Sequence, residues 1–187
     1  MLNYDTSIKE EKKYSGLTVR EIYPLMKLNV RGKSRDFLTT IGKNINMILP
    51  IEANTSSSSN NYTAIWLSPD EWMIVSNNTV DRENNNYKIE ELLFNKISKT
   101  KLGAVTDVSD QFVMFNLKGE KIFDLLSTGC PFDFNKFKTK KGAVTQTLLA
   151  QIDVIIYFKE INSVSLFVRR SFSEHLMSWI NDGASRL

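Results

Sequence analysis

The sequence predicts an α+β fold built from an internally duplicated unit, with helices packed on two antiparallel sheets. Three observations carry this prediction. Short segments rich in β-branched and aromatic residues alternate with segments whose apolar residues recur at helical spacing. The order strand, strand, helix, two or three strands, helix occurs twice along the chain. Glycines and apolar residues of the two copies match at one constant offset.

The clearest copy of this unit begins near residue 102. Residues 104–108 and 112–117 have strand composition, and the turn chemistry of Ser109-Asp110-Gln111 predicts that they form a hairpin. A helix is expected after Gly119, and Gly129 stands where a left-handed residue would end it. The apolar residues of this helix fall on one face: Ile122, Phe123, Leu125 and Leu126.

The first copy of the unit lies 87 residues earlier (119 minus 32). Residues 17–22 and 25–30 predict two strands, Ser34 is suited to cap a helix, and Gly42 is suited to close it. The offset keeps residue identity at several positions. These pairs are Gly16 and Gly103, Asn29 and Asn116, Gly32 and Gly119, Leu38 and Leu125, and Gly42 and Gly129. We interpret the match as a duplication.

The rest of each half follows the same order. In the first half, residues 62–67 and 71–76 predict a hairpin, and residues 87–99 predict a helix. In the second half, strands are expected at 143–150, 152–158 and 164–168, before a helix capped by Ser171. The runs of serine and asparagine between these elements are expected to be surface loops.

These elements predict the domain organisation. Residues 1–15 are polar and are expected to form a flexible N-terminal arm or an extended contact segment. Residues 16–100 and 101–187 are expected to be two α+β halves, intertwined as one compact domain with pseudo-twofold symmetry.

Composition excludes several classes of protein. The net charge of +3 comes from basic and acidic residues interspersed along the chain, so nucleic-acid binding is not predicted. No segment approaches the roughly 18 apolar residues of a membrane span. The single Cys130 cannot form an internal disulfide, and the first residues do not resemble a signal peptide, so a cytoplasmic location is expected.

The potential catalytic side chains are isolated from one another. His175 is the one histidine, without a second ligand at metal-binding spacing, so a packing or interface role is favoured. A serine or cysteine nucleophile would need this same histidine as its base. Cys130 follows a helix C-terminus, which does not lower a thiol pKa, so a structural thiol is favoured over a reactive one.

Other polar and aromatic residues have ordinary explanations. Asp70 and Glu71 are adjacent, so in a strand they would point to opposite faces and could not form an acid–base pair. Trp66 and Trp72 are expected to pack on a sheet rather than to stack on a ligand. A solvated surface is favoured over binding to an acidic partner for the basic residues Arg169, Arg170, Lys138, Lys140 and Lys141.

The glycines do not form a phosphate-binding loop, because neither dinucleotide-type nor P-loop spacing occurs. We therefore expect no catalytic, cofactor-binding or metal-binding residue in this chain.

Five strings in order give the chain a family resemblance. They are Ser68-Pro69-Asp70-Glu71-Trp72, Thr106-Asp107-Val108-Ser109, Gly129-Cys130-Pro131-Phe132-Asp133, Gln146-Thr147-Leu148-Leu149-Ala150, and Arg170-Ser171-Phe172 leading to Trp179. Over roughly residues 16–184 the chain resembles the gamma subunit of heterotetrameric sarcosine oxidase.

The resemblance implies a fold like the folate-binding domain of aminomethyltransferase, the glycine cleavage T-protein, which is itself a duplication. It also implies a complex that oxidises sarcosine to glycine, hydrogen peroxide and a one-carbon unit accepted by tetrahydrofolate. In that family FAD, FMN, NAD and folate are held by the alpha and beta subunits, and zinc by the delta subunit. The gamma chain carries no known catalytic group, so no family site residue transfers to this sequence.

Two functional hypotheses follow. The first is a non-catalytic structural subunit that contacts its partners through the last helix and the corner around Cys130, and that self-associates when isolated. The second is a free-standing tetrahydrofolate-binding or aminomethyltransferase-like protein, which the duplicated fold would allow.

Overall fold

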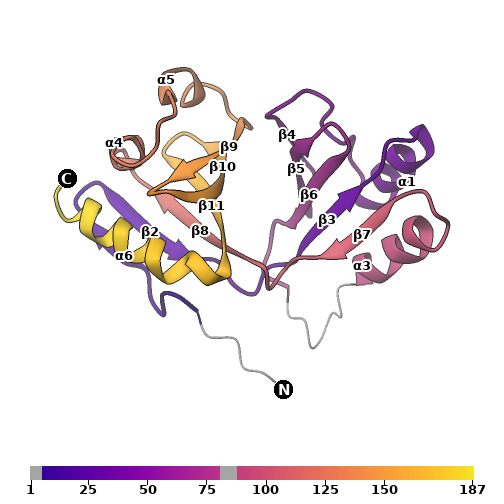
Figure 1. Cartoon of the computed structure of the whole chain (residues 1–187), viewed down its shortest axis with the longest axis horizontal. Helices are drawn as coiled ribbons and strands as arrows, with labels where there is room; N and C mark the ends of the chain where they lie inside the picture. Colours follow the sequence, from indigo (N-terminus) through magenta and orange to yellow (C-terminus); the bar gives the residue numbers. More distant parts are fainter. Residues whose placement is uncertain (1–5, 81–87) are drawn as a thin grey trace. The chain divides into compact units, whose positions relative to one another are not determined.

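The computed structural model describes residues 6–80 and 88–187. The chain divides into two compact units, each with its own sheet (Figure 1). Unit 1 spans Met1–Tyr23 and Gln111–Leu187, and unit 2 spans Pro24–Asp110. The fold is the predicted α+β arrangement with two antiparallel sheets and packed helices.

The sheet of unit 1 has six strands in the order β1-β2-β8-β11-β10-β9. Their bounds are β1 Lys12–Tyr14, β2 Leu17–Glu21, β8 Phe112–Lys118, β9 Val144–Leu149, β10 Ile152–Glu160 and β11 Ser163–Arg169. All neighbouring strands are antiparallel. Alternate residues such as Val154, Ile156 and Phe158 of β10 enter the core, as the period of a strand requires.

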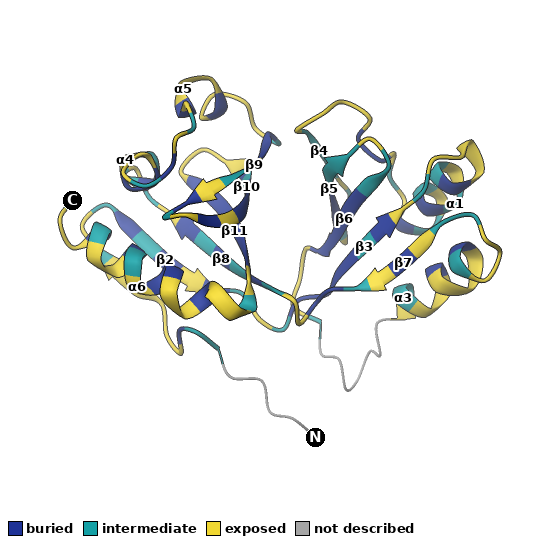
Figure 2. Cartoon of the chain, viewed as in Figure 1, coloured by how far each residue is buried: buried dark blue, intermediate teal, exposed yellow. Residues whose placement is uncertain are grey.

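Helices bury one face of this sheet. Their bounds are α4 Ile122–Ser127, α5 Phe134–Phe137, the 3₁₀ turn η2 Arg170–Phe172 and α6 Ser173–Ala184. The buried residues of α6 repeat at helical spacing and join the sheet core: Leu176, Met177, Ile180 and Ala184. Its other face is exposed (Figure 2).

The sheet of unit 2 has five strands in the order β4-β5-β6-β3-β7. Their bounds are β3 Lys27–Arg31, β4 Ser56–Ser58, β5 Tyr62–Ser68, β6 Glu71–Ser76 and β7 Ala104–Asp107. The helices are α1 Arg35–Ile45, α3 Lys88–Leu93 and the π-helical segment η1 Phe94–Ser98. Phe37, Ile41, Leu93 and Ile97 from these helices complete the core.

The hairpin predicted at residues 104–117 is wrong. β7 pairs with β3 in unit 2, with Arg31 opposite Ala104, whereas β8 pairs with β2 and β11 in unit 1. The predicted turn residues instead join β7 to β3, because Lys27 N donates to Ser109 Oγ (2.9 Å) and Val108 N donates to Lys27 O (2.9 Å). Strand β2 of the first repeat therefore joins the sheet that holds β8 of the second repeat. Strand β7 of the second repeat likewise joins the sheet that holds β3 of the first repeat.

This exchange explains why the compact units differ from the predicted halves. β2 belongs to the first sequence repeat but lies in unit 1, and β7 belongs to the second repeat but lies in unit 2. The predicted boundary at residues 100 and 101 marks the sequence repeat, while contacts change at residues 23–24 and 110–111.

The N-terminal segment from residue 6 onward differs from the flexible arm expected at 1–15. Lys12–Tyr14 forms strand β1 against β2, and Ile8 is buried in the core of unit 1. The Glu21 carboxylate accepts hydrogen bonds from the backbone N–H of Ser7 (2.7 Å) and Ile8 (3.3 Å). Residues 1–5 lie outside the described part of the chain.

Helix α1 begins as predicted but ends later. Ser34 caps it, because its hydroxyl accepts a hydrogen bond from Phe37 N (3.0 Å). The helix continues past Gly42 to Ile45 and ends at Asn46, which adopts the left-handed conformation with φ of 53°. Asn46 N–H donates to Gly42 O, so Gly42 supplies an acceptor rather than the terminating residue.

Other local predictions need correction. The last helix α6 begins at Ser173, after the turn η2 and without a side-chain cap, so Ser171 does not cap it. The serine tract expected as a loop contains strand β4. The helix expected at 87–99 is described from Lys88 and changes from α to π geometry at Phe94, while Tyr87 and residues 81–86 lie outside the described residues.

Two matched glycines explain the close packing of the exchanged strands. A Cβ on Gly119, where φ is 135°, would lie 2.1 Å from Gly16 O, and a Cβ on Gly103 would lie 2.3 Å from Arg31 O. Gly16 and Gly103 are equivalent in the repeat, as are Gly32 and Gly119. The two contacts are not equivalent in the repeat, but in both of them backbone meets backbone without space for a side chain.

We expect Gly119→Ala to lower the free energy of unfolding by roughly 2–3 kcal/mol, because a φ of 135° strains a residue with a Cβ and Gly16 O is held in place by a hydrogen bond from Lys121 N (3.2 Å). Urea unfolding followed by circular dichroism measures the loss. Ser15→Ala is the control at an exposed neighbour and should change stability by less than about 0.5 kcal/mol. Equal stability of the Gly119 variant and the wild-type chain would contradict the packing described here.

Candidate functional site

The corner 129–133 is packed through backbone and aromatic contacts. Gly129 does not adopt a positive φ, so the predicted left-handed helix end is wrong. A Cβ at Gly129 would lie 2.4 Å from the ring of Trp179, which explains the glycine by close approach. Gly129 O accepts a hydrogen bond from Ala150 N (2.9 Å), which ties the corner to the turn after β9. Asp133 caps α5 by accepting from Asn135 N (2.9 Å).

Cys130 is 8% exposed, and its Sγ lies 3.6 Å from Thr147 Oγ1 of β9. It belongs to the core of unit 1. Burial of the thiol agrees with the structural role favoured by the sequence. Its neighbours supply packing and one weak hydrogen bond.

An aromatic cluster surrounds the corner. Its rings have centroids 5.1 to 6.4 Å apart, in tilted and edge-to-face arrangements. The members are Phe123, Phe132, Phe134, Phe137 and Phe158. The cluster holds α4, α5 and the corner against β10, so this part of unit 1 is a packing centre.

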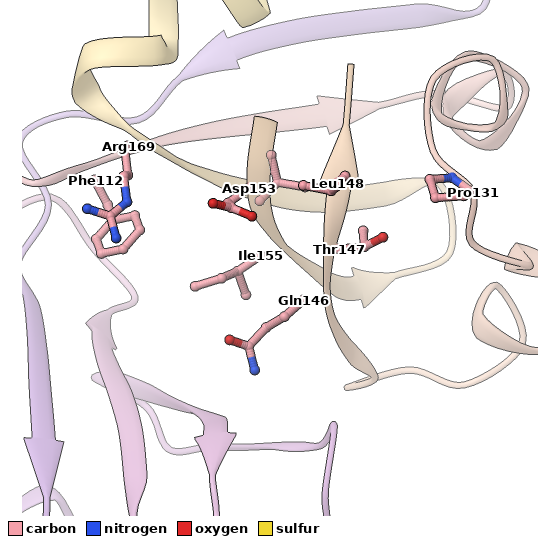
Figure 3. Close-up of a pocket in the computed structure, with 9 residues that line it drawn as sticks. Phe112, Pro131, Gln146, Thr147, Leu148, Asp153, Ile155 and Arg169 are labelled. Atoms are coloured by element: carbon pink, nitrogen blue, oxygen red, sulfur yellow. The ribbon is translucent and has the colours of Figure 1, made fainter. Parts of the chain in front are cut away.

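A groove of about 550 Å³ lies beside this corner in unit 1. Strand register builds it, since Leu148 of β9 pairs with Asp153 of β10 and Arg169 of β11 pairs with Phe112 of β8. Figure 3 shows Arg169 and Phe112 at one end and Pro131 at the other, with side chains of β9 and β10 between them. The remaining lining residues are Gln146, Thr147, Val154 and Ile155.

The chemistry of this groove suits contact with another molecule. Asp153 and Arg169 are exposed, and the apolar side chain of Leu148 is 46% exposed. Exposed apolar groups beside exposed charged groups are typical of contact surfaces.

A second concavity of about 470 Å³ lies in unit 2, at the end of α1. Its lining includes Met47 and two strongly exposed isoleucines, Ile48 at 85% and Ile51 at 82%. The sequence singled out neither concavity: the groove of unit 1 joins residues that lie far apart in the sequence, while the second concavity is lined by the single stretch 38–51.

Asp70 and Glu71 do not form an acid–base pair, as predicted. Asp70 lies in the β5–β6 turn and binds Ser68 Oγ (2.9 Å), with Arg31 Nε at 3.6 Å and Lys33 Nζ at 3.7 Å. Glu71 instead accepts a hydrogen bond from Asn29 Nδ2 (2.7 Å). The Ser68 hydrogen bond, with the positive charges of Arg31 and Lys33, holds the pKa of the Asp70 carboxyl below its ordinary value.

The two tryptophans pack on the sheet of unit 2, as expected. They form a cross-strand pair between β5 and β6. Trp72 is buried, its Nε1 donates to Pro50 O (2.7 Å), and its ring lies 6.0 Å from that of Phe37. Trp66 is partly buried against the same core.

His175 and the basic residues lie at the surface. His175 is exposed on α6, which excludes a packing role within this chain and leaves an interface role as a prediction. Arg169 lines the groove of unit 1, while the exposed lysines at 138, 140 and 141 follow α5. The outer face of α6 is mostly polar, with Phe172 at its start as the exposed large apolar residue.

No three His, Cys, Asp or Glu side chains gather as a metal site within residues 6–80 and 88–187. No helix among the described residues is long and apolar enough to cross a membrane. The expectation of no catalytic, cofactor or metal residue stays a prediction.

Comparison with known proteins shows which family the chain belongs to. The model of the sarcosine oxidase, gamma subunit family matches residues 31–186. The chain belongs to this family. The sequence-based resemblance to sarcosine oxidase gamma subunits is thereby confirmed.

One curated relative is similar in sequence, and one solved structure is similar in fold. The gamma subunit of sarcosine oxidase from Corynebacterium sp. (strain U-96) is 26% identical over 121 residues, which cover 65% of this chain and 55% of that subunit. The alignment thus spans little more than half of its relative. A structure of heterotetrameric sarcosine oxidase from Corynebacterium sp. U-96, in complex with pyrrole 2-carboxylate, matches with a TM-score of 0.80 at 22% identity, covering 91% of this chain and 84% of that chain.

The predicted likeness to aminomethyltransferase also holds at the level of the fold. Aminomethyltransferase T of the glycine cleavage system from Bartonella henselae matches with a TM-score of 0.63 at 14% identity, covering 89% of this chain and 46% of that chain. The gamma subunit family and the T-protein therefore share this duplicated α+β architecture.

We expect Asp70→Asn to lower stability at pH 7, because the neutral amide accepts the Ser68 hydrogen bond less strongly and attracts Arg31 and Lys33 less than the carboxylate does. The folded-state pKa is lowered, so this stabilisation is present above the unfolded pKa of about 3.9 and is lost as pH falls through the folded-state pKa. Urea midpoints measured from pH 7 to pH 2 should therefore converge for variant and wild type. The exposed Asp153→Asn is the control, and a constant difference across this range would contradict the ion-pair explanation.

Proposed function

We propose that this chain is a non-catalytic structural gamma subunit of a flavin-dependent heterotetrameric sarcosine oxidase. The family match over residues 31–186 carries the proposal. The likeness in fold to a chain of a heterotetrameric sarcosine oxidase supports an assembled state. In this proposal the complex converts sarcosine to glycine, hydrogen peroxide and a one-carbon unit passed to tetrahydrofolate, and it works in the cytoplasm.

The partners in this proposal are the alpha, beta and delta subunits. FAD, FMN, NAD and tetrahydrofolate are assigned to alpha and beta, and zinc to delta. The residues of this chain do not fit these groups, because the glycines lack phosphate-loop spacing and His175 stands alone on an exposed helix face. We therefore assign no chemical step to this chain, whose contribution is to bind and shape its partners.

Expression of the chain with and without its native partner subunits tests this function. We expect the wild-type chain to co-purify in a stoichiometric complex that carries flavin absorbance and oxidises sarcosine. The isolated chain should show no flavin absorbance and no peroxide formation. Stoichiometric flavin binding or sarcosine oxidation by the isolated chain would contradict a structural role.

The free-standing folate-binding alternative gives a different result. Likeness to aminomethyltransferase at 14% identity supports the fold alone, so we do not favour this function. Calorimetry of the isolated chain with tetrahydrofolate separates the two. Saturable binding by the isolated chain would favour the alternative, whereas no heat of binding at millimolar ligand is expected for the structural subunit.

A further inference from the structure

Four strands form the edges of the two sheets, and one of them differs from the rest. β1 and β4 have three residues each, and β7 has four. β1 carries Lys12 and Lys13, and β7 ends at Asp107. β9 has six residues, Val-Thr-Gln-Thr-Leu-Leu, without a charge or a proline. Short length, charge and proline are the usual protections of an exposed edge, and β9 has none of them.

The hydrogen-bonding pattern between β9 and β10 shows which backbone groups of β9 point outward. Phe158 N donates to Ala143 O (2.9 Å), and β9 pairs with β10 without a register shift from Val144 to Leu149. Bonded and non-bonded pairs alternate in an antiparallel ladder, so Thr145, Thr147 and Leu149 face β10 with their N–H and C=O groups. The backbone groups of Val144, Gln146 and Leu148 therefore point away from the sheet.

The side chains of these outward residues lie on the face that carries the groove of unit 1. Leu148 and Gln146 line this groove together with Phe112, Ile155 and Pro131 (Figure 3). A strand added to β9 would place every second side chain on the same face, next to Leu148. An apolar side chain there would cover Leu148, which is 46% exposed in the chain alone.

We propose that β9 is a docking edge, to which an extended segment of a partner subunit adds as a further strand. The segment is uncharged along its paired residues and carries an apolar side chain that enters the groove over Leu148. Backbone hydrogen bonds supply much of the affinity, and the groove supplies specificity. This inference rests on the proposed function, because the partner is another subunit of the oxidase complex.

Hydrogen exchange in the assembled complex tests the docking edge directly. The complex of this chain with its native partner subunits is compared with the isolated chain, with residue-level resolution. The amide of Leu148 points outward, so its exchange should slow by roughly tenfold or more on assembly. The amide of Ile161, in the β10–β11 turn, should exchange at an unchanged rate.

A charge on the edge tests the same proposal by assembly. Leu148→Lys should weaken assembly with the partner subunits by about tenfold or more, because lysine blocks both strand addition and the groove. Ile161→Lys is the matched control, since Ile161 is 82% exposed and belongs to the same unit. Circular dichroism of both variants checks that each is folded, and native mass spectrometry measures assembly.

The outcomes separate the docking edge from the proposed function. If the wild-type chain does not assemble with the partner subunits, the proposed function fails. If it assembles while Leu148 exchange is unchanged and both lysine variants assemble alike, the docking edge is wrong and the structural role stands. Protection of β9 by a second copy of this chain, unchanged on addition of partners, also overturns the docking edge.

Discussion

The exchange of one strand between the sequence repeats is the constraint on which the rest of the structure depends. β2 supplies Val19 to the core of unit 1, and β7 supplies Val105 to the core of unit 2. Each unit is thus built mainly from one repeat, and one strand of the other repeat adds to its core. Each core therefore contains residues from both repeats. The two glycine contacts, Gly119 with Gly16 and Gly103 with Arg31, occur where these exchanged strands meet their sheets.

Local sequence chemistry predicts the elements better than their partners. Runs of β-branched and aromatic residues predict β6 at Glu71–Ser76 and β5 near Tyr62–Ser68, and the hydroxyl of Ser34 predicts the start of α1. Turn chemistry at Ser109 is real, because Ser109 N donates to Asp107 Oδ1 (2.8 Å). This Asx turn does not pair β7 with β8, which belong to different sheets. Nothing in a local pattern distinguishes such a turn from a hairpin, so strand exchange could not be predicted.

The glycines also show that a local pattern does not reveal tertiary contacts. Gly42 and Gly129 match in the repeat, and both stand near the ends of helices, so a left-handed conformation was the natural prediction. The left-handed residue in α1 is Asn46, and Gly129 is required by the ring of Trp179, 50 residues along the chain (179 minus 129). The groove of unit 1 also cannot be predicted from the sequence. The register of four strands brings together its residues, which range from Phe112 to Arg169.

The corner that marks the second repeat acquires a physical role through β9. Gly129 O holds the turn after β9 through Ala150 N, and Cys130 Sγ contacts Thr147 on that strand. Pro131 closes one end of the adjacent groove, while the phenylalanine cluster anchors the corner to β10. Ala150 and Gln151 form a tight turn at positive φ without glycine, a conformation that tertiary contacts must stabilise. A segment without acid–base chemistry can therefore still determine function, because it fixes the position and register of the edge that we assign to a partner subunit.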